Sequence, residues 1–212
     1  MEQYVNDFSK MALALTSAQM AKDDAIKEHG VGEEIAIHFL AWVDDALIAI
    51  CQMNAETGKL DPEERFNRCK ELCKILRKDL WCTALTMVSE GYCSLDSSKT
   101  NNMDLAAAFA DPKLPVYECI TITHVSIDED SGHIAPVSMV AAPYKMGVGR
   151  IVEWKEVLVY PEKAEQYTKQ TKYPIMLRRV LQMPPDESTN DDSLNTAAMS
   201  IVNLGFAMQS II

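Results

Sequence analysis

The segment IAIHFLAWVDDALIAICQM, residues 35–53, can form either one long helix or two strands. As a helix it would be apolar on every side with Asp44 and Asp45 in its middle, which suits neither a surface helix nor a buried one. As strands, residues 35–43 alternate between two faces, Asp44 and Asp45 form a tight turn, and residues 46–53 return. The segment therefore predicts a β-hairpin over 35–53.

Two helices are indicated on either side of the hairpin. Asp61 is a good N-cap, Pro62 suits the first helical position, and the acids that follow favour the positive end of a helix dipole. Apolar residues then mark one face, which predicts a helix over 61–78. Apolar residues at helical spacing also predict an amphipathic helix over 5–28.

Four later runs are rich in β-branched and aromatic residues and predict strands over 81–93, 116–127, 134–142 and 150–160. Short polar turns separate the last three runs, and this spacing is typical of an antiparallel meander. With the hairpin, the pattern predicts an α+β fold. We expect an antiparallel sheet of about six strands, covered on one face by helices 5–28 and 61–78 and by the C-terminal helices.

The chain is predicted to form a single α+β domain over 1–181, followed by a linker over 182–192, QMPPDESTNDD. A last helix over 193–212 carries apolar residues on one stripe, and so long a linker lets it dock on its own domain or on a neighbouring subunit. We also expect a short helix near 104–110 and two helical pieces after Pro161, the second of which opens at Pro174.

The charge balance argues against several classes of partner. The 212 residues hold 20 Lys and Arg against 31 Asp and Glu, a net charge of −11, which repels phosphate backbones and predicts no nucleic-acid partner. No run approaches the ~18 apolar residues of a membrane span. The six cysteines lie in apolar, periodic segments and predict free buried thiols, which suits a cytoplasmic protein, in the host cytoplasm if phage-encoded.

Two residues are candidates for acid–base catalysis. Glu90 ends an otherwise apolar strand, where a carboxylate can serve as an acid or base, and His124 lies on a later strand. The favoured alternative for Glu90 is that it caps the strand end or pairs with a cation of the following loop. Cys93 with His124 as its base is a further alternative, but no glycine elbow supports it, and a buried thiol is the default.

A polar turn joins two of the predicted strands and carries candidate metal ligands. The two imidazoles and two carboxylates around the sequence DEDSG can converge at one end of a hairpin and bind zinc or another divalent ion. These candidates are His124, Asp128, Asp130 and His133. The same residues are also typical of an ordinary polar turn, and no other cofactor is predicted.

Short motifs give the chain a resemblance. They are SEGY at residues 89–92, Asp111-Pro112 with Pro115, and Glu118 at a strand opening. Over residues 35–160 the chain resembles a set of uncharacterised phage and bacterial α+β proteins. The resemblance implies the strand order and a phage or prokaryotic origin, and it implies no chemistry.

The favoured functional hypothesis is a non-enzymatic protein of phage or prokaryotic type that acts through protein–protein contacts, most simply as a homodimer. The alternative is a small metal-dependent or hydrolytic enzyme that uses Glu90 with His124 and His133. A third hypothesis, that the acidic surface imitates nucleic acid, ranks last because both signs of charge are interspersed along the chain.

Overall fold

The computed structural model describes residues 2–30, 34–94, 116–128, 131–146, 152–159, 172–186 and 191–211. The helix predicted near 104–110 and the first one predicted after Pro161 lie outside these ranges, as do Asp130 and the middle of the predicted linker.

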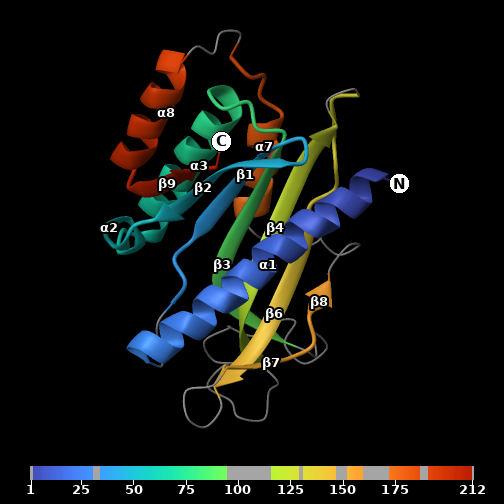
Figure 1. The fold of residues 1–212 in the computed structure, drawn as a ribbon, viewed down its shortest axis with the longest axis vertical. Helices are drawn as coiled ribbons and strands as arrows, with labels where there is room; N and C mark the ends of the chain where they lie inside the picture. Colours follow the sequence, from blue (N-terminus) through green and yellow to red (C-terminus); the bar gives the residue numbers. More distant parts are fainter. Residues whose placement is uncertain are drawn as a thin grey trace.

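An antiparallel sheet forms the centre of the protein (Figure 1), with the order β7-β6-β4-β3-β1-β2-β9, while β5 pairs with β4 and β8 with β6. The strands are β1 His38–Val43, β2 Ala46–Met53, β3 Ala84–Ser94, β4 Val116–Asp128, β5 His133–Ile134, β6 Ser138–Met146, β7 Val152–Trp154, β8 Leu158–Val159 and β9 Phe206–Ser210. This confirms the α+β fold and the predicted meander, which is formed by β4, β6 and β7. The described residues form nine strands where about six were predicted, partly because the runs 134–142 and 150–160 each divide into two.

The segment 35–53 forms the predicted hairpin of β1 and β2. Its turn has Asp44 in a left-handed conformation with φ of 51°, which aspartate tolerates better than most residues. The Asp44 amide donates a hydrogen bond of 2.7 Å to the Thr83 hydroxyl, and Thr83 precedes β3. The hairpin turn is thereby attached to the strand that pairs with β1.

The helices are α1 Glu2–His29, α2 Ala55–Gly58, α3 Pro62–Lys78, α7 Lys172–Leu181 and α8 Asp191–Asn203. The predicted cap of α3 is confirmed, because the Asp61 carboxylate accepts hydrogen bonds from the amides of Glu63 and Glu64 at 3.0 and 3.1 Å. The predicted helix over 5–28 is confirmed as the longer α1.

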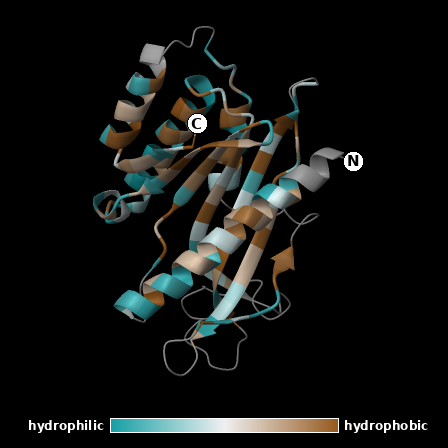
Figure 2. Cartoon of the chain, in the orientation of Figure 1, coloured by the Kyte–Doolittle hydropathy of each residue, from teal (hydrophilic) through white to brown (hydrophobic). Residues whose placement is uncertain are grey.

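Helices cover both faces of the sheet, so the expectation of one covered face was wrong (Figure 1). Successive residues of the central strands point to opposite faces and are apolar on both. Val88 and Ile122 pack with Met11 of α1, whereas Leu85 pairs with Val125 on the face of α3 and α7. Figure 2 shows hydrophobic residues along β4 and β6 where α1 crosses them.

The prediction of a helix over 193–212 was wrong for the second half of this segment. Helix α8 ends at Asn203, and Gly205 adopts a φ of 89° that only glycine takes easily. A Cβ atom at Gly205 would lie 1.8 Å from the Thr57 hydroxyl oxygen, so the chain turns close against α2. Strand β9 then pairs antiparallel with β2, where apolar spacing alone had suggested continued helix.

Candidate functional site

Two buried polar clusters lie between α1 and the sheet, and each contains one of the two predicted catalytic residues. The Asp7 cluster comprises Asp7, Trp42, Thr86, His124 and Ser126. The Glu90 cluster comprises Lys22, the Ile35 amide, Glu90 and Tyr144.

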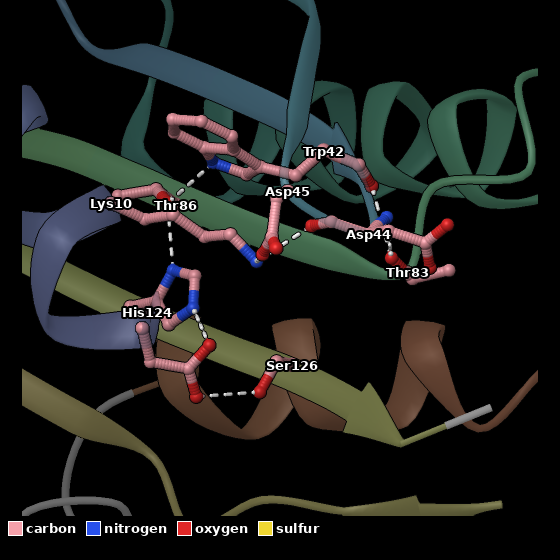
Figure 3. A network of polar contacts seen from close by, with 9 residues as sticks. Lys10, Trp42, Asp44, Asp45, Thr83, Thr86, His124 and Ser126 are labelled. Carbon is pink, nitrogen blue, oxygen red and sulfur yellow. Dashed lines mark hydrogen bonds and ion pairs between the residues drawn. The ribbon is translucent and has the colours of Figure 1, made fainter. Parts of the chain in front are cut away.

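The Asp7 cluster is a chain of hydrogen bonds (Figure 3). Trp42 Nε1 donates to Thr86 Oγ1 at 2.9 Å, and Thr86 Oγ1 lies 2.8 Å from His124 Nδ1. His124 Nε2 lies 3.1 Å from Asp7 Oδ1, and the Ser126 hydroxyl donates to Asp7 Oδ2 at 2.8 Å. Because an ionised carboxylate only accepts hydrogen bonds, Nε2 carries a proton toward Asp7. Nδ1 accepts from the Thr86 hydroxyl when the imidazole is neutral and donates to it when the ring is charged.

The groups around Asp7 favour the ionised form of its carboxylate. Burial acts to raise the pKa of Asp7, but hydrogen bonding and charge from His124, the Ser126 hydroxyl and the nearby Lys10 ammonium outweigh it, so the pKa lies below its ordinary value of 3.8.

The order of hydroxyl, imidazole and carboxylate in the Asp7 cluster matches the groups of a nucleophilic triad. However, Thr86 is fully buried and its oxygen already binds two partners, so the arrangement holds α1 on the sheet.

The Glu90 cluster is an ion pair with two further donors. Lys22 Nζ lies 2.7 Å from Glu90 Oε1, and the two side chains are 4% and 13% exposed. The Tyr144 hydroxyl and the Ile35 amide donate to Glu90 at 3.2 and 3.0 Å. Burial and the nearby Glu90 and Glu118 carboxylates raise the pKa of Tyr144, so its hydroxyl keeps its proton. Three donors around one carboxylate favour a structural ion pair over acid–base chemistry.

The structure does not bring Glu90 and His124 together. In the β3–β4 register Glu90 lies opposite Ile120, whereas His124 lies opposite Thr86. Both side chains are on the α1 face, but four residues of strand separate them, about 13 Å at the usual rise per residue. Cys93, opposite Tyr117, is farther still from His124 along the same register.

The structure does not bring the four predicted metal ligands together either. Asp128 lies opposite His133 in the β4–β5 pair, and its carboxylate accepts a hydrogen bond from the Ser131 amide in an exposed turn. His124 is buried inside the Asp7 cluster, and Asp130 lies outside the described residues. Within the part of the chain that is described, no group of three or more His, Cys, Asp or Glu side chains is placed to hold a metal ion.

Sequence reasoning missed Asp7 and Lys22, the two partners that α1 supplies. Both are nearly fully buried, at 7% and 3% exposure. The signal was present, because Asp7 and Lys22 flank Met11, Ala14 and Ala18 on one helical stripe. A charged residue at each end of an apolar stripe indicates a polar partner on the surface that the stripe covers.

A third feature lies at the other end of the molecule, where β9 forms the edge of the sheet beside α8 (Figure 1). Helix α8 buries Ala197 and Ile201, yet its neighbouring face is also apolar and exposed. Leu194, Met199 and Val202 are 48%, 69% and 61% exposed. We name these three residues, together with β9, the α8–β9 surface.

Comparison with protein-family models, with curated proteins and with solved structures finds no match to this chain. The resemblance of residues 35–160 to phage and bacterial proteins therefore stays a prediction. Among the helices described here, none is long and apolar enough to cross a membrane.

Proposed function

We propose that this protein is non-enzymatic and acts through protein–protein contacts, and that its α8–β9 surface pairs with the same surface of a second copy. The observation that carries the proposal is an exposed apolar helix face beside the edge strand of the sheet. Contiguous exposed apolar surface of this kind is typical of protein interfaces.

The backbone of β9 supports edge-to-edge pairing. The Ile211 amide donates to the Ile48 carbonyl and the Asn54 amide to the Gly205 carbonyl, so odd-numbered residues of this segment face β2. The amides and carbonyls of Phe206 and Met208 therefore point away from β2. No other strand of the described residues pairs on that side. A second β9, antiparallel across a two-fold axis, would satisfy these groups and continue the sheet.

The distribution of charge supports a second copy as the partner. A chain of net charge −11 repels its own copies, so a self-contact needs a region without acids. Residues 193–212 contain no Asp, Glu, Lys or Arg. Edge strands of monomeric proteins are commonly protected by charged residues, and β9 has none.

The test is sedimentation velocity of the full chain between about 1 and 100 µM, a range that brackets common dimer affinities. We expect the wild type to reach twice the chain mass of 23.7 kDa. Met199→Glu and Val202→Glu place two acids at the two-fold interface and should shift the protein to monomer. The matched control is Met20→Glu, because Met20 is similarly exposed at 62% and its helix, α1, lies on the opposite face of the sheet from α8.

A second variant tests the edge pairing separately. Met208→Pro removes an amide that points away from β2 and leaves the β2 ladder intact, so it should weaken the dimer while the fold is kept. A wild type that stays monomeric at 100 µM, or a dimer that both acidic variants retain, would refute the proposal.

A further inference from the structure

A groove of about 900 Å³ lies at the end of the sheet where residues 34–37 lead into β1. Met53 of β2 and Met87 of β3, which are 3% and 4% exposed, line its floor together with Ile37, which precedes β1. Arg65 of α3 and Tyr173 of α7 line it from the helices. Its volume lies within the range of small-molecule sites, and methionine side chains adapt to ligands of different shape.

Arg65 contributes a positive charge to this groove. Its Nη1 donates to the Gly58 carbonyl at 3.0 Å, which holds the guanidinium in place, and its Nε is buried without a hydrogen-bond partner. No ion pair among the described residues includes Arg65. A partly buried guanidinium without an anion is unfavourable, and a carboxylate or phosphate would match its planar donors.

The other lining residues add an aromatic ring and carboxylates to the groove. The ring of Tyr173 is held edge-on against Phe66 with centroids 5.3 Å apart, and the Tyr173 side chain also hydrogen-bonds with the Arg65 side chain. Two carboxylates also border the groove: that of Glu90, which Lys22 already neutralises, and that of Glu34, which is an exposed residue. Lys59, also exposed at the rim, pairs with Glu56. Among the described residues that line the groove, Arg65 is therefore the partly buried charged residue without a counterion.

We propose that the groove binds an amphipathic organic anion, with its carboxylate or phosphate head on Arg65 and its apolar body against Met53 and Met87. This site is independent of the pairing proposed for the α8–β9 surface.

The test is isothermal titration calorimetry of the full chain with three probes of equal chain length: octanoate, octyl phosphate and octanol. We expect at least one anion to bind at least tenfold more tightly than octanol, and the tighter of the two identifies the head group. Arg65→Gln should remove that tenfold difference. Arg178→Gln is the matched control, because Arg178 is exposed on α7 and does not line the groove.

Ala55→Trp provides a second variant that does not disturb the core, since Ala55 is exposed at the rim of the groove. Its indole should obstruct the groove and weaken all three probes. The proposal is overturned if none of the probes binds at 2 mM, if octanol binds as tightly as the anions, or if Arg178→Gln lowers affinity as much as Arg65→Gln. Unchanged anion binding by both Arg65→Gln and Ala55→Trp would also overturn it, because the anions would then bind elsewhere.

Discussion

Asp7 and His124 are 117 residues apart in the chain, yet Asp7 Oδ1 lies 3.1 Å from His124 Nε2 in the buried space between α1 and β4. Fifteen residues further along α1, Lys22 forms the ion pair with Glu90. The two candidate catalytic residues are thus the points at which the sheet holds the two halves of one helix.

Replacing Asp7 with asparagine should destabilise the protein at neutral pH by about 1–3 kcal/mol, because the His124 and Ser126 donors lose a charged acceptor. The pKa of Asp7 is lower in the folded state than its ordinary value of 3.8. Its stabilising contribution is therefore complete above that value and is lost as pH falls through the folded pKa. Urea unfolding at pH 7 and pH 3 should show the difference between wild type and Asp7→Asn shrinking at pH 3. A difference that does not change with pH would contradict the assignment.

Removing only one partner of the Lys22–Glu90 pair should be costly. Glu90→Gln leaves the buried Lys22 ammonium without its counterion, and we expect a loss of about 3–5 kcal/mol. The double variant Lys22→Met with Glu90→Gln should recover part of that loss. Lys74 and Glu71 form a surface pair at the same 2.7 Å, and the equivalent changes there should cost less than about 1 kcal/mol. Equal losses at the two pairs in urea unfolding would show that burial is not the cause.

The turn before β9 should tolerate no side chain. Gly205→Ala combines a left-handed φ of 89° with a Cβ atom 1.8 Å from the Thr57 hydroxyl oxygen, and should destabilise the protein by at least about 1–3 kcal/mol. Gly91→Ala is the control, because nothing lies within 4 Å of its added Cβ and its φ is not positive. Thermal unfolding of the two variants measures the difference. Similar melting temperatures would mean that the turn has another conformation.

The cysteines should differ sharply in reactivity. Burial raises the pKa of Cys51, Cys69 and Cys82 to about 12, so these thiols stay protonated and shielded. Cys93 is only half-buried, and a hydrogen bond with Cys119 lowers its pKa. A chromogenic disulfide reagent at pH 8 should therefore modify Cys93 first in the native protein and all six cysteines after denaturation. Cys93→Ser should abolish the fast phase, and a fast phase that survives would contradict this order.

Local sequence signals were enough for most of the secondary structure. The two-residue alternation around Asp44 and Asp45 predicted the hairpin, and the Asp61 cap predicted α3, because both signals act between residues close in the chain. The same signals placed His124 within a strand, which is confirmed, and Glu90 at a strand end, which was wrong because β3 continues to Ser94. They also predicted the fold class, since consecutive strands with short turns pair antiparallel.

The amino-acid sequence by itself determined the α+β class, the hairpin, the capped helix and the excess of negative charge. Only the tertiary structure decided that Asp7 and Lys22 reach across from α1 to His124 and Glu90, that helices cover both faces, and that the last residues form β9 instead of continuing α8. These contacts join residues far apart in the chain, and β9 gains its hydrogen bonds from β2. A local pattern cannot show such partners, because the free energy that selects them comes from burial and pairing that exist only once the sheet has formed.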